Sequence, residues 1–283
     1  MLTTAKQVLA DARARKYAVP AFDCVADVWV RALLETAEAC RSPIILMCLE
    51  PDVAGNGWVY FSGLVRAVAD HHKVPVVLHL DHTTDLDVIR KVVDLGFTSV
   101  MIDGSALPFA ENVKLTRAAV ALAHPHGVSV EAELGKVGGM DLDATCQSDN
   151  VLTDPAEVTR FIDETDCDAL AVSIGTSHGV YKSQPTLNIA RMKEINAVSR
   201  VPLVMHGGSG TPVDQVQETI RNGICKVNIY ADCRIAMGRG LAKSASSQKR
   251  QDPLPSEVLG PIGDAIAAAA REKMEQLYSC GKA

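Results

Sequence analysis

The 283-residue sequence has few aromatic residues, no long apolar run and no excess of basic charge. Phe, Tyr and Trp make up only 4% of it, so Val, Ile, Leu and Ala must fill the core. The net charge of −6 and the scattered Lys and Arg residues argue against a nucleic-acid or membrane-surface partner, which requires a basic patch. No apolar stretch reaches the roughly 20 residues that a membrane span needs.

The eight cysteines include no Cys-x-x-Cys pair, which argues against a zinc site built from thiolates. Cys48 and Cys225 lie in apolar runs and are expected to pack as small buried hydrophobic residues. Residues 1–16 contain Asp11 and lack an apolar core, so they do not have the pattern of a signal peptide. These features favour the reducing cytoplasm.

Short β-branched runs alternate with amphipathic stretches along the chain, and there are eight such runs. Nearly continuous apolar strands between helices indicate a parallel sheet covered by helices. Eight units in a chain of this length favour a closed (β/α)₈ TIM barrel over an open doubly wound sheet. The predicted strands are residues 17–23, 43–49, 75–81, 99–105, 129–135, 169–175, 202–208 and 225–231.

We expect residues 1–283 to form one domain, ending in a helical extension at about 254–283. The longest stretch without periodicity, about 136–153, follows the fifth predicted strand and contains glycines. Such a loop at the carboxyl end of a barrel strand is a candidate mobile active-site loop. The alternative is a disordered surface excursion.

Three histidines stand at the carboxyl ends of predicted strands: His82 after the third, His178 after the sixth and His206 in the last part of the seventh. Since the carboxyl ends of barrel strands all face the active site, these histidines can converge. Three imidazoles with one open position make a catalytic zinc site. Any one of them alone would more often be a hydrogen-bonded structural residue. Acidic and amide side chains stand at the same end: Asp81, Asp103, Glu131, Glu133 and Asn228.

The stretch "HLDH" (79–82) needs separate treatment because strand side chains alternate. His79 and Asp81 share a face, so His82 reaches the barrel mouth only where the strand ends or bulges. His79 lies deeper. It is either a support for Asp81 or a ligand, or a satisfied core histidine.

The stretch "HGGSG" (206–210) precedes a helix predicted to start near Thr211. A glycine-rich turn at a helix N-terminus offers backbone N–H groups to an anion. Barrels often bind phosphate after the seventh and eighth strands, so this turn is a candidate phosphate site.

Taken together, these motifs resemble those of the class II, metal-dependent ketose-bisphosphate aldolases, which include fructose- and tagatose-1,6-bisphosphate aldolases. The resemblance runs nearly end to end. The motifs that carry it are "HLDH" (79–82), "SVMIDGS" (99–105), "VEAELG" (130–135) with "GG" (138–139), "GTSHGVYK" (175–182), "HGGSG" (206–210) and "KVNI" (226–229).

The resemblance implies a zinc aldolase that reversibly cleaves a phosphorylated ketose to dihydroxyacetone phosphate and an aldehyde. Zinc would polarise the C2 carbonyl, and no lysine Schiff base would be needed. It also implies a monovalent cation, Na⁺ or K⁺, near the phosphate, and a homodimer or homotetramer. The implied zinc ligands are His82, His178 and His206, with Asp103 and Glu133 at a second position. Asp81 is the implied acid/base, and the implied substrate residues are Gly179, Lys182, Gly207, Gly208, Ser209, Asn228, Ile229, Tyr230 and Ala231.

The chain departs from the family pattern in two places. In the loop that reads "GGMDLD", Asp141 stands where the family has a glutamate that moves the C3 proton. After the eighth strand, Ala231 replaces a phosphate-binding hydroxyl and Tyr230 a smaller or acidic residue. Arg250 and Arg271 are candidates for the arginine that holds a distal phosphate.

These departures keep other functions open. A ketose monophosphate or an unusual sugar acid is one alternative substrate. A catalytically weak sugar-phosphate binder or accessory subunit of the same fold is another reading. A zinc hydrolase of a different barrel family is disfavoured, because the first predicted strand ends in "AFDC" rather than in His-x-His.

Overall fold

In the computed structural model, which describes residues 1–140, 147–148, 150–179 and 184–283, eight parallel strands close into a barrel. The neighbours around the barrel run β1-β11-β10-β8-β5-β4-β3-β2, so each of the eight predicted strands is present. This confirms the (β/α)₈ prediction. The barrel strands are β1 (Val19–Asp23), β2 (Ile44–Cys48), β3 (Val76–Leu80), β4 (Ser99–Ile102), β5 (Ser129–Leu134), β8 (Ala169–Val172), β10 (Leu203–Met205) and β11 (Ile224–Ile229).

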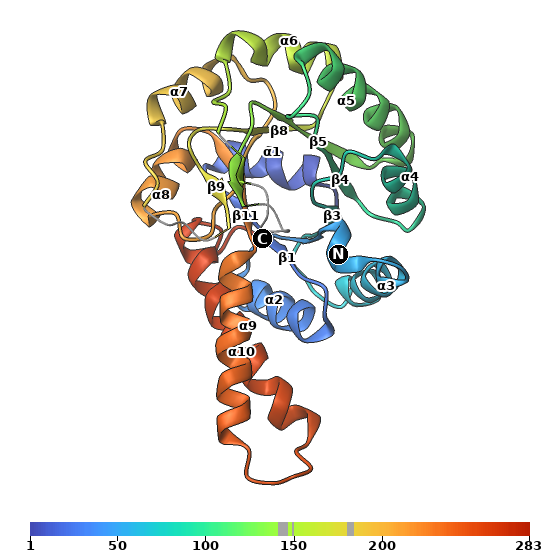
Figure 1. The fold of residues 1–283 in the computed structure, drawn as a ribbon, viewed down its shortest axis with the longest axis vertical. Coiled ribbons are helices and arrows are strands. Elements are labelled where there is room, and N and C mark those ends of the chain that lie inside the picture. Colours follow the sequence, from blue (N-terminus) through green and yellow to red (C-terminus); the bar gives the residue numbers. More distant parts are fainter. Residues whose placement is uncertain (141–146, 149, 180–183) are drawn as a thin grey trace.

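Helices surround the barrel on its outside, as Figure 1 shows. Helix α6 begins at a capping residue, because the Asp154 side chain accepts a hydrogen bond from the backbone of Ala156. The helices are α1 (Ala5–Arg15), α2 (Asp27–Cys40), α3 (Gly57–Ala69), α4 (Leu86–Asp94), α5 (Phe109–Ala123), α6 (Pro155–Thr165), α7 (Ile189–Val198), α8 (Val213–Arg221), α9 (Ala231–Ser247) and α10 (Pro255–Gln276), with 3₁₀ turns η1 (Glu50–Val53) and η2 (His124–His126).

The apolar core has two layers, one inside the barrel and one between the strands and the helices. Alternate residues of one strand divide between them: Ile45 and Met47 point inward, while Ile44, Leu46 and Cys48 pack outward. Helix α1 closes the end where the strands begin, because its Val8 and Leu9 pack with the inward strand residues. The backbone N–H of Thr3, just before α1, donates to Val76 at the start of β3. The open end of the barrel is therefore the one where the strands terminate.

A small second sheet, in the order β7-β6-β9, stands next to that open end. It is built from β6 (Gly138–Met140), β7 (Gln147–Ser148) and β9 (Ser177–His178). The sequence did not predict these strands, because segments of two or three residues carry no periodic signal. The pairing of β6 with β9 joins the segment after β5 to the one after β8.

Helices α9 and α10 form an antiparallel arm that projects away from the barrel (Figure 1). They approach closely at Gly240, where an added Cβ would lie 2.5 Å from the Cα of Ile262. Helix α10 also packs against α2, which attaches the base of the arm to the barrel wall. None of the helices within the described residues is long and apolar enough to cross a membrane.

Candidate active site

His82, His178 and His206 converge at the open end of the barrel. His82 follows the end of β3, His178 ends β9 and His206 follows β10. One ring nitrogen of each lies within 4.8 Å of those of the other two. The ring centroids are 4.5 Å apart for His82 and His206, and 5.1 Å apart for His82 and His178. The geometry predicted from the strand ends is present.

The rings of His82 and His206 meet through different nitrogens. Nε2 of His82 lies 2.7 Å from Nδ1 of His206. On the far side, Nδ1 of His82 is 3.0 Å from a carboxylate oxygen of Asp103, and Nε2 of His206 is 2.9 Å from Glu131. Carboxylates that accept a hydrogen bond from the outer nitrogen leave the inner nitrogen with a lone pair, which is how metal-binding histidines are held.

Glu131 and Lys226 form a fully buried ion pair behind His206. The Lys226 ammonium lies 2.8 and 3.1 Å from the two Glu131 oxygens, and neither residue is more than 1% exposed. The sequence identifies Glu131 only as an acid at a strand end, and it does not single out Lys226. Strand alternation was the available signal, because Lys226 shares the inward face with Asn228 on β11.

Asp103 and Glu133 bring two more carboxylates to the group. Together with His82 they form a second cluster whose ligand atoms lie within 4.8 Å of one another. Burial, reinforced by the charge of Asp103, raises the pKa of Glu133 to about 8. One Glu133 oxygen accepts from the backbone of Val137 at 3.1 Å. The other is buried without a hydrogen-bond partner in the described part of the chain.

The electrostatics of the cluster favour a cation. Burial alone would lower the pKa of His82, but the charge of Asp81 and the hydrogen bond with Asp103 outweigh it and raise the pKa to about 10. Burial alone would raise the pKa of Asp103, and the contact with His82 reverses this and lowers it. Imidazole and carboxylate donors suit Zn²⁺ and similar divalent ions. The residues present therefore fit a divalent metal.

Asp81 lies next to the histidines and is held by Asn228. The Asn228 amide donates to Asp81 at 2.9 Å, across 147 residues of chain. Asp81 is only 4% exposed. Its neighbour His79 does not join this group: it is fully buried, and its Nδ1 lies 2.8 Å from the Ser99 hydroxyl. Burial lowers the pKa of His79 well below the usual value, so His79 is a neutral core histidine.

The "HGGSG" segment forms a tight turn beside the histidines. Gly207 and Gly210 both have positive φ, at +68° and +71°. The backbone N–H of Gly208 donates to Asn228 at 3.1 Å, and an added Cβ there would lie 2.3 Å from Val227. The Ser209 hydroxyl accepts from the backbone of Asp232 in α9 at 3.2 Å. The turn thus lies against β11 and the start of α9.

The other predicted substrate residues differ in whether their side chains can line the site. Ile229 is fully buried in the outer core, so its side chain does not line the site. Tyr230 donates its hydroxyl to Asp52 at 2.6 Å, and Ala231 is the first residue of α9. Gly179 follows β9 with φ +85°. Asp141 and Lys182 lie outside the described residues, as does part of the predicted 136–153 loop.

Neither candidate arginine lies beside the histidines of its own chain. Arg271 donates to the Cys40 sulfur at 3.4 Å, and Cys40 ends α2, at the end of the barrel where the strands begin. Arg250 lies in the connection between α9 and α10 and pairs with Asp252 at 2.8 Å. Figure 1 places this connection at the tip of the arm, away from the barrel.

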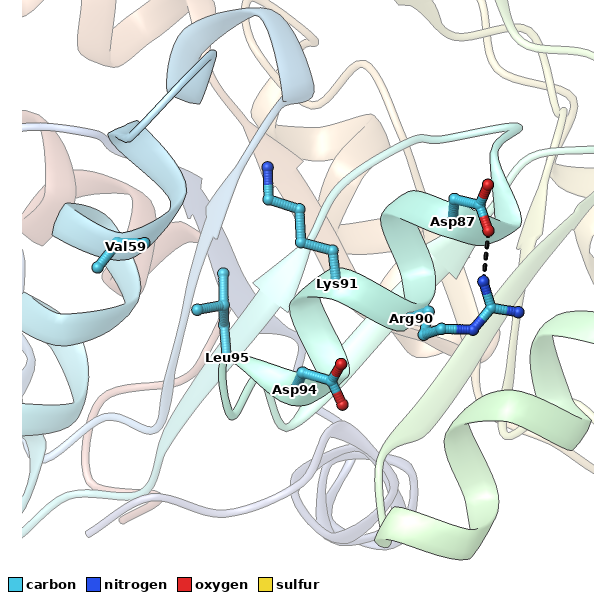
Figure 2. A pocket seen from close by; sticks show the side chains of 6 residues that line it. All are labelled: Val59, Asp87, Arg90, Lys91, Asp94 and Leu95. Carbon is cyan, nitrogen blue, oxygen red and sulfur yellow. Dashed lines mark hydrogen bonds and ion pairs between the residues drawn. The ribbon is translucent and has the colours of Figure 1, made fainter.

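A separate pocket lies on the outer surface between α3 and α4. Figure 2 shows that Lys91 and Asp94 extend from α4 on one side of it and Val59 from α3 on the other. The Lys91 ammonium is 5.1 Å from the centre of the Trp58 ring. The pocket is distinct from the barrel mouth. Its lining residues are Val59, Asp87, Arg90, Lys91, Asp94 and Leu95.

Comparison with known proteins agrees with this geometry. Residues 3–282 match the family described as "Fructose-bisphosphate aldolase class-II". A fructose-bisphosphate aldolase from Giardia intestinalis is 37% identical over 308 residues, covering 100% of this chain and 94% of that protein. The crystal structure of the YdjI aldolase from Escherichia coli K12 superposes with a TM-score of 0.89 at 32% identity, over 100% of both chains. A putative fructose-1,6-bisphosphate aldolase from Coccidioides immitis gives 0.85 at 29% identity, over 98% of this chain and 97% of the other.

The family match spans nearly the whole chain, and it implies a divalent metal, which the three histidines suit. The protein is accordingly a carbon–carbon lyase, and the chain belongs to the class II fructose-bisphosphate aldolase family.

Proposed function

We propose that this protein is a zinc-dependent aldolase that reversibly cleaves a phosphorylated ketose to dihydroxyacetone phosphate and an aldehyde. The observation that supports this most directly is the meeting of His82, His178 and His206 at the open end of the barrel, with Asp81 beside them. Three imidazoles leave one position open for substrate. A buried carboxylate next to that position can exchange a proton with the substrate.

The bound metal would supply Lewis-acid polarisation of the ketose carbonyl, with His82, His178 and His206 as its ligands. Asp103 and Glu133 would provide the second position. The chain's own acid/base is Asp81, which takes the C4 hydroxyl proton in cleavage and returns it in condensation. Asn228 donates to one Asp81 oxygen and so orients the carboxylate. No step requires a lysine Schiff base.

The phosphate of dihydroxyacetone phosphate would bind the turn formed by Gly207, Gly208 and Ser209. Backbone N–H groups of such a turn are suited to an anion. Gly179, Lys182 and the segment from Asn228 to Ala231 complete the proposed site, with a monovalent cation near the phosphate. For Ile229 the contact would come from the backbone, because its side chain is in the core. Asp141, which lies outside the described residues, would move the C3 proton.

The test is a retro-aldol assay with ketose mono- and bisphosphates, with zinc added and then removed by chelation. We expect cleavage that requires the metal and that borohydride does not trap on the protein. Asp81→Asn should lose cleavage but still exchange the C3 proton of dihydroxyacetone phosphate with solvent, whereas His178→Ala should lose both. Exposed Asp94→Asn and His126→Ala are the matched controls.

Undiminished cleavage after complete metal removal would refute the proposal. Binding of ketose phosphates without turnover by the zinc-loaded protein would instead identify it as a sugar-phosphate binder or accessory subunit. A homodimer or homotetramer in the cytoplasm stays a prediction.

A further inference from the structure

Beside Asp81, the side chains contributed by β1, η1 and β11 offer hydrogen-bond acceptors rather than donors. Strand β1 lies between β2 and β11 in the barrel, and Ala21 pairs with Asn228 in register. Asp23, two residues further along β1, has its side chain on the same inward face as Ala21. Asp23 therefore extends into the mouth next to Asn228.

Asp23 is a buried acid, and one of its two oxygens has no donor among the described residues. It is 2% exposed, and its Oδ1 has no hydrogen-bond partner among the described residues. Burial, followed by the charges of Asp81 and Asp52, raises its pKa well above the usual value. A buried carboxyl without a partner is costly to the fold, so its retention needs a reason.

Asn228 provides a second acceptor that is independent of the acids. Its Nδ2 is committed to Asp81 at 2.9 Å. Its Oδ1 is buried and has no partner within the residues that the structure describes, although the side chain is only 7% exposed. Because Nδ2 is held on Asp81, the amide oxygen points away from Asp81 and has a lone pair to offer.

Asp52, in the 3₁₀ turn after β2, adds a third acceptor to this side of the barrel mouth. It accepts from the Tyr230 hydroxyl at 2.6 Å, which leaves its other oxygen for a further donor. The two residues are 178 positions apart in the chain, so their contact joins the segments that follow β2 and β11. The Arg234 guanidinium lies over the Tyr230 ring, at 5.2 Å from its centre.

We propose that Asp23, Asp52 and Asn228 bind hydroxyl groups of the aldehyde half of the substrate, so that the substrate is a ketose 1-phosphate whose distal end is not phosphorylated. This inference rests on the proposed aldolase function and narrows its substrate class. Sugar hydroxyls donate hydrogen bonds to buried acceptors. A second phosphate offers acceptors only and would bring two negative charges towards the carboxylates of Asp52 and Asp81.

The experiment measures condensation of dihydroxyacetone phosphate with glyceraldehyde and with glyceraldehyde 3-phosphate, both enantiomers, by the zinc-loaded full-length protein. We expect kcat/KM for unphosphorylated glyceraldehyde to be at least tenfold higher. Asp23→Leu should lower that value about tenfold, because a hydrogen bond to a carboxyl group is lost. The double variant Asp23→Asn with Asp52→Asn should narrow the preference for unphosphorylated glyceraldehyde at least tenfold, since less negative charge is left to repel the phosphate.

Proton exchange at C3 of dihydroxyacetone phosphate, followed by NMR in D₂O, separates the two proposals. It needs the metal and the phosphate turn but no aldehyde, so both variants should retain the wild-type exchange rate. Asp94→Asn, an exposed acid on α4, is the control and should change neither measurement.

Preference of the wild type for glyceraldehyde 3-phosphate would overturn the inference and leave the aldolase function standing. Unchanged selectivity in both variants would also overturn it. Loss of exchange in Asp23→Leu would assign Asp23 a structural role instead. Absence of C3 exchange and of condensation in the wild type would overturn the proposed function and the inference with it.

Discussion

Nε2 of His82 lies 2.7 Å from Nδ1 of His206, so the two rings present different nitrogens to the same point. The opposite nitrogen of each is occupied by a carboxylate, Asp103 for His82 and Glu131 for His206. With a metal bound, the two neutral rings would therefore be held in opposite tautomers. Because of this asymmetry, the zinc affinity of a variant should depend on which ring nitrogen the new side chain replaces.

Amide substitutions at the two histidines should show this asymmetry. The Gln amide reaches the place of Nε2, and the Asn amide that of Nδ1. We expect His82→Gln to keep more zinc affinity than His82→Asn, and His206→Asn to keep more than His206→Gln. All four should bind zinc at least about 100-fold more weakly than wild type, more than the loss of an outer-shell partner causes. Competition with a chromophoric chelator measures this, and the same ranking at both positions would contradict the assigned nitrogens.

Breaking the buried pair Lys226–Glu131 should lower the unfolding free energy more than breaking an exposed pair. Lys226→Met leaves the Glu131 carboxylate buried without its ammonium, which costs about 3–5 kcal/mol. Lys6→Met breaks the ion pair with Asp168, in which Lys6 is exposed, and should cost about 1 kcal/mol or less. Urea unfolding measures both.

A variant that lacks both charges separates the effect of the ion pair on stability from its effect on zinc binding. The double variant Lys226→Met with Glu131→Gln should recover part of the unfolding free energy, because no unpaired charge stays buried. It should still bind zinc about 10- to 100-fold more weakly, since His206 loses its carboxylate. A double variant with wild-type zinc affinity would show that the pair does not position His206.

Much of the fold follows from the sequence because it depends on repeated local signals. Each barrel strand comes from a short apolar run, and the eight runs match the eight strands. Strands β6 and β9 were not predictable in this way. They exist through pairing between Gly138–Gly139 and Ser177–His178, a contact between distant segments that neither specifies alone.

The same distinction holds for the site. His82, His178 and His206 were predictable because strand ends meet at one barrel face. The roles of Glu131 and Lys226 depend on which inward side chains face each other across the barrel, and strand order and register decide that. The contact between Tyr230 and Asp52 likewise depends on how a turn after β2 folds over the mouth. Local patterns contain no such information.

His79 should make the protein less stable as the pH falls below about 6.5. Burial lowers its pKa in the folded protein, while the unfolded chain keeps a value near 6.5. Below that pH the unfolded state binds a proton that the folded state does not, so the unfolding free energy decreases by about 1.4 kcal/mol per pH unit. His79→Gln should remove this contribution to the slope between pH 6.5 and 5.

Unfolding by urea at several pH values checks the prediction, with chelator present so that metal binding does not contribute. Exposed His126→Gln is the matched control and should keep the wild-type slope. An identical slope in His79→Gln would mean that His79 is protonated in the folded protein as readily as in the unfolded chain.

Gly139 should control the position of His178, although it has no side chain to offer. It pairs with His178 between β6 and β9 and has φ +123°, which side chains rarely adopt. An added Cβ would lie 2.5 Å from the backbone nitrogen of His178 and 2.6 Å from its oxygen. Gly139→Ala must therefore move the strand that bears His178.

We expect Gly139→Ala to lower the unfolding free energy by about 1–3 kcal/mol and zinc affinity about tenfold or more. Gly63→Ala in α3 is the control, because no atom lies within 4 Å of its added Cβ. It should stabilise the protein by about 0.5–1 kcal/mol and leave zinc affinity unchanged. Wild-type zinc affinity in a folded Gly139→Ala variant would show that β6 does not fix the position of His178.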